Sequence, residues 1–514
     1  MLPGFPLDLT SMAVLRPRPQ GGLPMSSLNP QSPSSKSYQQ QLSRAIGVLG
    51  NICISVSAIT PTASIFIIAP VAFNLQGSGA FLAFVIAGII GLGMAMCYSE
   101  LGSAFPVVGG QYSIVARVLG RFPGFLAFAD YLTLAVFVPS SIALGAGQYV
   151  AVLFPNLTVN ANLVGAIIML ATTLIAILSI RANAFVTGIF LAVELLAVAT
   201  VSVLGLANIH QPLSILFSPQ TVNAQGALSP LAFGALLAGV STAIFAYNGY
   251  DGPIVFSEEM TGPRRGIARA VLWALGISIA AELIPVTAAL LGAPSLKELI
   301  HSNTPMSYVL SALGGPLLNT LVTIGVLCSI FNGNIAIILG YGRVIYSSGR
   351  DKAWPEPVSG WLELCHPKLK TPWVATALVG VIGTVLTALS SVAALVTFTG
   401  VLLVVLYALV ALSALVSRFT QKDLVRPYKM PLWPLWPLIG LIGCIVVFTQ
   451  QALSDMGICA AILVVAAIYY FFYLRPRQKT HWVMLDPTYG DDEETTAEDP
   501  LIKPTAGGEA QTSL

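Results

Sequence analysis

A proline among hydroxyl side chains, inside an apolar run, is the first feature of this sequence that could do chemistry. The run SAITPTASIF at 57–66 contains Pro61, and the hydroxyl residues around it are Ser57, Thr60, Thr62 and Ser64. Proline supplies no backbone N–H, and its ring displaces the carbonyl four residues earlier. Backbone groups released in this way are tolerated inside a membrane only against protein or a watery cavity. The run therefore predicts an interrupted helix that offers polar groups to a ligand.

A second run, AYNGYDGP at 246–253, has the same character. Its glycines and proline surround Asn248 and Asp251, so this helix should also unwind near its middle. At such a point one half-helix presents free N–H groups to an anion, and the other presents carbonyls to a cation. A zwitterion or an amine is the natural ligand. The alternative is that both prolines are simple kinks, which are common in membrane helices.

Long apolar segments must position these two runs. The chain has 514 residues, of which 55% are hydrophobic and 9% are charged, whereas roughly 25% of the residues in a soluble domain are charged. Lipid must therefore surround most of the chain, and we predict twelve membrane-spanning helices. Their expected limits are 45–73, 79–102, 123–153, 163–180, 185–208, 229–257, 266–292, 316–349, 372–390, 391–417, 431–453 and 456–473.

Basic residues predict how these helices cross the membrane. With a cytoplasmic N-terminus, the expected outer segments contain a single basic residue, Lys297. This asymmetry follows the positive-inside rule, and it predicts a multi-pass protein of the plasma membrane with both termini in the cytoplasm. The first and sixth spans enter the membrane in opposite directions, because an odd number of steps separates them. Two interrupted helices in this arrangement are typical of an inverted-repeat transporter.

The chain divides into three parts. Residues 1–43 are rich in Pro, Ser and Gln and predict a disordered cytoplasmic tail without a secretory signal. Residues 44–480 should form the transporter domain, and 481–514, with the acidic run DDEETTAED, a second disordered cytoplasmic tail. The domain divides further into a first repeat, a second repeat and two extra helices, at about 45–208, 229–417 and 431–473. Asn156 begins an N-glycosylation pattern on an expected outer loop.

Four segments resemble motifs of the amino acid–polyamine–organocation (APC) transporter superfamily. They are CYSELGSAFPVVGGQYSIVARVLG at 97–120, FAYNGYDGPIVFSEEMTGPRRGIARAV at 245–271, GRVIYSSGRDKAWP at 342–355 and RPYKMPLWPLWP at 426–437. The second resembles the signature of the family's sixth span, and all four occur in the family's order. The resemblance implies an all-α membrane protein with a five-plus-five inverted repeat, two extra helices, and breaks in helices 1 and 6.

The resemblance also implies roles for residues at the two interruptions. The family's G-S-G-I-F segment, which binds the substrate carboxylate, aligns with residues 62–66. Both family glycines are replaced here, so nearby hydroxyls would compensate, or the ligand would lack that carboxylate. Backbone carbonyls at 245–249 would receive the substrate amine. The expected binding residues are Ser57, Thr60, Thr62, Ala63, Ser64, Phe245, Ala246, Tyr247, Asn248, Asp251 and Asn332.

Acidic residues inside the spans are candidates for ion coupling. Glu194 lies near the middle of the fifth expected span, where many relatives in the superfamily carry a lysine. An ionisable group inside a bilayer is costly and usually faces a functional cavity, and burial disfavours the charged form of a carboxylate. Glu194 could therefore load and release a coupling proton. It could equally bind sodium or the substrate's ammonium group, or tie helices together as a neutral acid.

Two further residues are candidate gates. Phe245 matches the family's aromatic gate position, and Glu258 lies at the cytoplasmic end of the sixth span, where it could latch that end shut. We expect the acids near this end of the spans to pair with basic residues of the neighbouring loops. These acids are Glu100, Glu258 and Glu259, and their expected partners are Arg117, Arg264 and Arg265.

These observations predict a secondary active transporter of amino acids or related amines that works by alternating access, with proton coupling favoured over sodium. The sequence contains no G-x-x-x-x-G-K-[ST], HExxH or GxSxG motif, so ATP drive and an intramembrane enzyme are unsupported. We expect a small-molecule substrate and a lipid bilayer as partners, and no nucleic acid, metal or cofactor. An exchanger of amines or amino acids, and a transport-inactive receptor of the same fold, are the alternatives.

Overall fold

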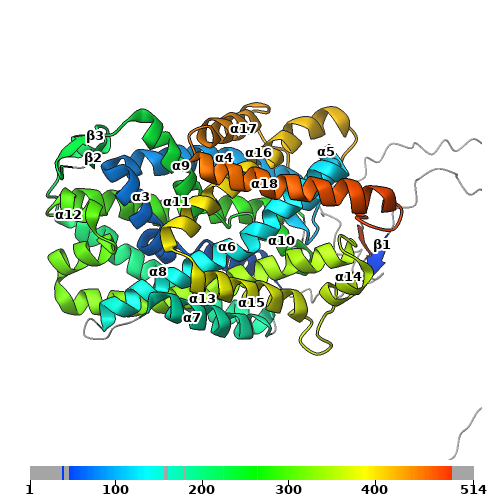
Figure 1. Ribbon diagram of the computed structural model, residues 1–514, viewed down its shortest axis with the longest axis horizontal. Helices are drawn as coiled ribbons and strands as arrows, with labels where there is room; N and C mark the ends of the chain where they lie inside the picture. The colour runs from blue at the N-terminus through cyan, green and yellow to red at the C-terminus, as the bar shows by residue number, and fades with distance from the viewer. Residues whose placement is uncertain are drawn as a thin grey trace, which may run out of the picture. The chain divides into compact units, whose positions relative to one another are not determined.

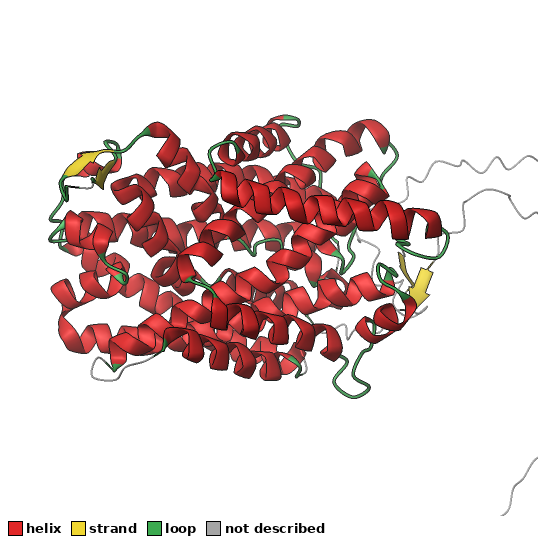
Figure 2. Cartoon of the chain, in the orientation of Figure 1, coloured by secondary structure: helices red, strands yellow, loops and turns green. Residues whose placement is uncertain are grey.

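The computed structural model describes residues 37–39, 46–154, 160–178, 180–223, 225–262, 264–484 and 486–488. Helices make up nearly all of this part of the chain, with two small two-stranded sheets (Figure 2). The all-α architecture expected from the sequence is confirmed. The glycosylation pattern at Asn156 and most of the two predicted tails lie outside the described residues.

The first half of the chain contains both parts of the first interrupted helix. Its helices are α1 Val48–Ile59, α2 Pro61–Ala63, a π-helix Ser64–Ile68, α3 Ala69–Gln76, α4 Ala80–Ala104, α5 Gly110–Leu119, α6 Arg121–Leu153, α7 Ala161–Ala176 and α8 Ile180–Ala207. A short antiparallel hairpin follows, with strands β2 Gln220–Val222 and β3 Leu228–Pro230.

The second half begins with the other interrupted helix. Its helices are α9 Phe233–Tyr247, α10 Gly252–Val255, α11 Arg265–Gly292, α12 Leu296–His301, α13 Pro305–Arg350, α14 Glu356–Leu362, α15 Trp373–Leu389, α16 Val392–Thr420, α17 Leu435–Phe448 and α18 Leu453–Tyr469. Figure 1 shows α5 and α14 at one end of the helices, and α12 with the β2–β3 hairpin at the other.

Seven helical segments in the described chain are long and apolar enough to cross a membrane. They are Val48–Ala104, Arg121–Leu153, Gly188–Ala207, Arg265–Gly292, Pro305–Arg350, Val392–Thr420 and Leu453–Arg477. The shorter α7, α9, α15 and α17 are also apolar. Each predicted span overlaps one of these helical segments, and Val48–Ala104 overlaps two spans. Twelve crossings remain a prediction, because the shorter helices fall below the length of a full crossing.

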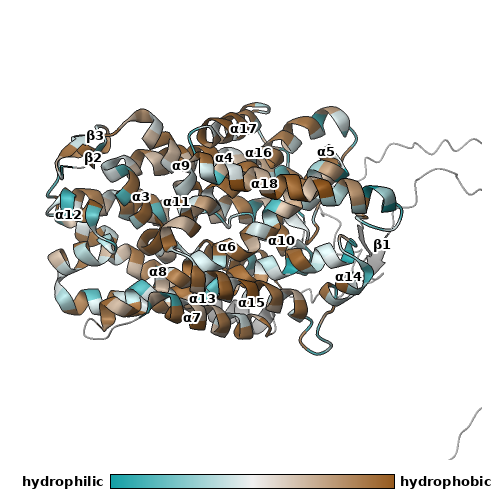
Figure 3. Ribbon diagram, viewed as in Figure 1, coloured by the Kyte–Doolittle hydropathy of each residue, from teal (hydrophilic) through white to brown (hydrophobic). Residues whose placement is uncertain are grey.

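The outer surfaces of these helices are apolar, as a lipid environment requires. Leu174 on α7, Leu317 on α13 and Val465 on α18 expose most of their surface, and Figure 3 shows apolar residues along α15 and α18. Scattered exposed leucines are ordinary in soluble proteins. A chain this poor in charge, with apolar side chains on several outward faces, needs lipid as its solvent.

The two interrupted helices pack against each other in opposite directions. The first half of one, α1, contacts α10, which is the second half of the other. The second half of the first, comprising the π-helix and α3, contacts α9. Helix α13 runs alongside α1, α6 and α8 and therefore borders both interruptions. The opposite orientations predicted for the first and sixth spans are confirmed.

The chain beyond α18 folds back and inserts a tryptophan between α5, α6 and the end of α13. Trp482 is 1% exposed, stacks on Tyr112 and lies edge-on to Phe125. Its ring N–H donates to the Arg121 carbonyl at 2.9 Å, and its backbone N–H donates to the Lys352 carbonyl at 3.1 Å. These contacts join the end of the chain to three helices.

Because of this packing, the folded body extends beyond residue 480, where the sequence predicts that it ends. Residues 481–484 were assigned to the C-terminal tail from the sequence, yet their backbone and side chains belong to the packed body. A little further on, strand β4 (Asp486–Thr488) pairs in parallel with β1 (Ser37–Gln39). The acidic composition of residues 481–514 predicts disorder. A single tryptophan gives no periodic pattern, so the packed segment at 481–484 could not be predicted from the sequence.

Replacing Trp482 with alanine should lower the stability of the protein. Deleting a large buried aromatic ring typically costs about 3–5 kcal/mol, so the thermal unfolding midpoint of the purified protein should fall by several degrees. Trp361 on α14 is 63% exposed, and its alanine variant is the matched control. Equal midpoints for the two variants would contradict the packing described for Trp482.

Candidate functional site

The first interruption lies at Thr60. Helix α1 ends there because Thr60 takes φ 52° and ψ 67°, the left-handed conformation that a β-branched residue rarely adopts. The Thr60 N–H still donates to the Val56 carbonyl at 3.1 Å, and a new helix begins at Pro61. Proline suits the first helical position, since its missing N–H is not needed there. The interruption predicted around Pro61 is confirmed.

Helix α13 holds this interruption in place. The Asn332 side-chain amide donates to the Ser57 hydroxyl at 2.6 Å. Next to it, Gly333 faces the Thr60 side chain so closely that a Cβ atom at Gly333 would overlap it. The remaining oxygens, Thr60 Oγ1 and Asn332 Oδ1, are buried without a hydrogen-bond partner among the described residues. Asn332, a predicted binding residue, therefore touches the break and is a structural support for it.

The second interruption separates α9 from α10. Asn248 is extended, at φ −62° and ψ 142°, and Gly249 has φ 120°. Only glycine reaches this positive φ without strain. The Tyr407 hydroxyl donates to the Asn248 side-chain oxygen at 3.3 Å, and α10 begins at Gly252. The unwinding predicted from the run of glycines and proline is confirmed.

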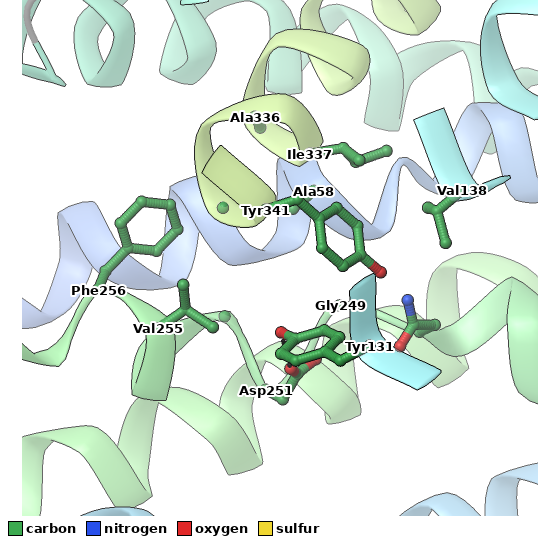
Figure 4. Close-up of a pocket in the computed structure, with 13 residues that line it drawn as sticks. Ala58, Tyr131, Val138, Gly249, Asp251, Val255, Phe256, Ala336, Ile337 and Tyr341 are labelled. Carbon is green, nitrogen blue, oxygen red and sulfur yellow. Dashed lines mark hydrogen bonds between the residues drawn. The ribbon is translucent and has the colours of Figure 1, made fainter. Parts of the chain in front are cut away.

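A cavity opens beside the second interruption. The space between its lining atoms is about 420 Å³ when the open mouth is included. Segments from α1, α6, the second interruption and α13 form its walls. Six of its lining residues are Ala58, Tyr131, Asn248, Asp251, Phe256 and Tyr341. Figure 4 shows the ring of Tyr131 next to Asp251, and the Tyr131 and Tyr341 rings meet edge-on.

Asp251 is the acidic residue in the lining of this cavity. Its Oδ2 accepts a 2.7 Å hydrogen bond from the Gln111 amide and a longer one, 3.4 Å, from the Tyr131 hydroxyl. Gln111 is itself held by the Tyr98 hydroxyl, which donates to Gln111 Oε1 at 2.7 Å. The residues that line the cavity include no lysine, arginine or histidine. The cavity therefore carries one carboxylate without a basic residue beside it.

Predicted binding residues divide between two places. Asn248 and Asp251 line the cavity. Phe245, Ala246 and Tyr247, in the last turn of α9, lie outside its lining and are buried. Tyr247 turns toward α4 instead: its hydroxyl donates to the Phe84 carbonyl at 3.2 Å, and its ring packs edge-on against Phe84.

The hydroxyls of the first interruption bind protein groups rather than lining the cavity. Glu194 Oε1 accepts from the Thr62 hydroxyl at 2.7 Å and from the Thr62 N–H at 3.3 Å. The Ser64 hydroxyl donates to the Ala246 carbonyl at 2.8 Å, which joins the two interrupted helices directly. Ala63 lies between them, fully buried. Glu194 is also fully buried, and its Oε2 has no hydrogen-bond partner among the described residues.

A second buried acid lies close by on α11. Glu282 accepts a 3.0 Å hydrogen bond from the Ser278 hydroxyl, one turn earlier on the same helix. It is near enough to Ser64 and Glu194 to interact with both. In the sequence Glu282 lies inside the expected span 266–292. Nothing in its spacing could place it beside Glu194, because α8 and α11 are far apart along the chain.

Buried ion pairs join the elements at the end that carries α5 and α14. Glu258 accepts the Val108 N–H at 2.9 Å and pairs with Arg350 at 3.2 Å. Glu259 pairs with Arg343 on α13, and neither side chain is exposed to solvent. Truncating one partner of such a pair is costly, because the other charge stays buried. These pairs connect α10, the loop before α5 and α13.

The partners expected for two of these acids were wrong. Glu100 pairs with Arg418 at 2.6 Å and with Arg426 at 3.1 Å, and Glu259 pairs with Arg343. The sequence predicts Arg117, Arg264 and Arg265 as partners. The observed partners come from α13, α16 and the α16–α17 connection, which approach only after the chain has folded.

Comparison with known proteins agrees with this architecture. A sequence profile described as amino acid permease matches residues 45–482. The branched-chain amino acid permease BcaP of Bacillus subtilis is 23% identical over 87% of this chain and 96% of its own length. The b(0,+)-type amino acid transporter 1 of Mus musculus is 25% identical, with 84% and 88% covered. The methylthioribose transporter of Bacillus subtilis is 23% identical, with 68% and 76% covered.

Apolar helices, two central interruptions and a cavity beside the second of them define a multi-pass membrane transporter rather than an enzyme. The profile match covers most of the sequence. The chain belongs to the amino acid permease family.

Replacing Gly333 with alanine should disturb the first interruption, because the added methyl group has to displace the Thr60 side chain. Overpacking of this kind costs about 1–3 kcal/mol, so we expect a lower unfolding midpoint and weaker transport. Gly325 lies on the same helix with only an ordinary contact at 3.5 Å from Val193, so Gly325→Ala is the control. If both variants match the wild type, α13 does not brace the break as described.

Proposed function

We propose that this protein is a secondary active transporter that carries amino acids or related amines by alternating access and is driven by a proton gradient. The observation that carries the proposal is the pairing of two interrupted, antiparallel helices, with a cavity beside the second interruption. The ends of interrupted helices present peptide dipoles to a solute.

Helix halves that can move separately support the alternating-access part of this proposal. At the end that carries α5 and α14, the Ile46 N–H donates to the Glu259 carbonyl at 3.0 Å, and the Thr261 N–H donates to the Ile46 carbonyl at 2.8 Å. Opening the cavity toward this end requires α1 to leave these partners. Glu258 bonds to the adjacent loop and to Arg350, which suits the gate role expected for it. Phe245 would gate the opposite side by swinging in from the end of α9.

Glu194 is the group that we assign to proton coupling. It is fully buried, and within the described part of the chain it accepts hydrogen bonds from the N–H and the hydroxyl of Thr62, directly after the first interruption. A charged carboxylate accepts both of these hydrogen bonds, whereas a protonated one needs an acceptor for its own hydrogen. Loading a proton on Glu194 therefore changes how firmly the start of α2 is held. This links protonation to the helix break at which the substrate is handled.

The position in the cell and the domain division complete the proposal. We assign both termini, the basic loops and the end that carries α5 and α14 to the cytoplasm, and the protein to the plasma membrane, from the distribution of Lys and Arg. The transporter domain at 44–480 would then be flanked by two cytoplasmic tails. Its two repeats, about 45–208 and 229–417, would each supply one interrupted helix.

Replacing Glu194 with glutamine should abolish accumulation driven by a pH gradient, because glutamine cannot exchange a proton. The measurement is solute uptake into proteoliposomes with and without an inward proton gradient. Glu298 on α12 is exposed, and Glu298→Gln should retain the gradient response. Gradient-driven uptake that persists in Glu194→Gln removes Glu194 from the coupling mechanism.

The same vesicles separate this proposal from its alternatives. Efflux that requires external substrate would identify an exchanger. Binding without accumulation under any gradient would identify a transport-inactive receptor. Net accumulation that follows the proton gradient is the result that the proposed function requires.

A further inference from the structure

We propose that Glu282 is a second proton-binding group of the coupling machinery, and that the Ser64 hydroxyl changes its hydrogen-bond partner when Glu282 gains or loses that proton. This inference rests on the proposed function and adds to it a residue that the assignment of Glu194 leaves out. Loss of the proton from Glu282 would break a direct hydrogen bond between the two interrupted helices. The argument starts from the surroundings of Glu282.

Glu282 on α11 is a buried acid without a cationic partner. Its side chain is fully buried, and none of the ion pairs in the described part of the chain includes it. Among the described residues, the titratable side chains that interact with it are Glu194 from α8 and Tyr247 from α9. A buried carboxyl group without a cation is far less costly when it is protonated. Glu282 therefore holds a proton in the arrangement described here.

Each of the two neighbouring acids has an oxygen to spare. Glu282 Oε1 accepts the Ser278 hydroxyl at 3.0 Å, whereas its Oε2 is buried without a hydrogen-bond partner among the described residues. Glu194 has the same arrangement, with Thr62 bonded to Oε1 and no such partner at Oε2. Two interacting carboxylates disfavour each other's charge, most of all in a site without water. The two acids therefore hold at least one proton between them.

The Ser64 hydroxyl carries a single hydrogen but has several oxygens within reach. It donates to the Ala246 carbonyl at 2.8 Å, and the Ile59 carbonyl is farther away at 3.3 Å. The Glu282 side chain is also close enough to interact with this hydroxyl. Hydrogen bonds to a charged acceptor are roughly twice as strong as those to a neutral one. Once Glu282 has lost its proton, the hydroxyl therefore turns from Ala246 to Glu282.

This exchange of partners acts at the centre of the transporter. Ser64 begins the π-helix of the first interrupted helix, and Ala246 lies in the last turn of α9, directly before the second interruption. With a proton on Glu282, the bond between Ser64 and Ala246 joins the two helices and favours the arrangement that encloses a solute. Without the proton this bond is lost and the contact loosens, which favours release. The proton passes to water on the side to which the transporter is open.

The first test asks whether Glu282 exchanges a proton, and it needs no solute. Infrared difference spectra of the purified full-length protein in lipid nanodiscs are recorded between low and high pH. The wild type should show a protonated-carboxyl band that disappears as the pH rises and that Glu282→Gln lacks. Glu298→Gln, on an exposed residue of α12, is the control and should keep this band. Identical spectra for Glu282→Gln and the wild type would overturn the inference.

The second test follows the bond between Ser64 and Ala246. Hydrogen–deuterium exchange of the backbone at 62–68 is compared between variants at the same pH, so that intrinsic exchange rates cancel. At high pH the wild type should exchange at least about fivefold faster than Glu282→Gln, because one hydrogen bond between the helices is lost. At low pH the two should be equal. Equal exchange at both pH values would contradict the proposed change of partner.

Ser64→Ala removes the hydroxyl that responds to the proton. This variant should exchange rapidly at 62–68 at low and high pH alike, beyond the change in intrinsic rate. Ser413→Ala on α16 is the matched control, because that hydroxyl donates only along its own helix, to the Leu409 carbonyl at 2.8 Å. It should respond to pH as the wild type does. A response in Ser64→Ala as large as that of the wild type would exclude Ser64 from the mechanism.

A conservative variant separates proton exchange from packing. Glu282→Asp keeps an ionisable carboxyl group and should restore the infrared band that Glu282→Gln lacks. Thermal unfolding midpoints within a degree or two of the wild type show that the variants are folded. If Glu282→Gln does not fold, the comparison of Ser64→Ala with the wild type at both pH values decides the question.

Transport distinguishes failure of this inference from failure of the proposed function. Proteoliposomes with an inward proton gradient are given a mixture of the radiolabelled protein amino acids and putrescine. Accumulation by the wild type that is lost in Glu282→Gln supports both. Accumulation that persists in Glu282→Gln overturns the inference and leaves proton-driven transport standing. If the wild type accumulates nothing, the proposed function fails, and the infrared and exchange measurements still decide whether Glu282 binds the proton.

Discussion

A backbone N–H or C=O group inside a membrane must find a partner within the protein, because lipid offers none. The two interruptions of this transporter break the helical pattern that normally supplies those partners. Asn332 bonds to Ser57, Glu194 bonds to Thr62, and Ser64 bonds to the Ala246 carbonyl. At the first break Glu194 on α8 accepts the backbone N–H of Thr62, whereas Asn332 on α13 braces the break through the Ser57 hydroxyl. The positions of the cavity and of the buried acids depend on how these groups are satisfied.

The same requirement determines which polar groups face the cavity beside the second break. At the first break the N–H and hydroxyl of Thr62 and the hydroxyl of Ser64 bond to protein groups. Asn248 and Asp251 keep polar atoms at the cavity, supported by Tyr407, Gln111 and Tyr131.

Much of this architecture could be predicted from local sequence. Pro61 and the Asn248–Gly252 run indicated both interruptions, since proline and glycine act through the backbone of the residues beside them. The membrane helices could be predicted from the apolar runs and from the low proportion of charged residues. Asp251 and Asn248 were expected at the cavity because they lie within the break itself.

Other parts could not be predicted, since they depend on contacts between distant segments. Tyr131 and Tyr341 line the cavity, yet in the sequence they are ordinary aromatic residues of apolar helices. Gln111 reaches Asp251 across 140 positions of sequence, and no local pattern marks that contact. Tyr247 was expected at the ligand, but the turn after it directs the ring to Phe84.

The most direct test is an experimental structure in lipid nanodiscs with a transported solute bound, at a resolution that shows the backbone. The account predicts helices that stop at Thr60 and at Asn248, with ligand density between Asp251, Tyr131 and α13. Continuous helices through both positions, or ligand density confined to the first break, would contradict it.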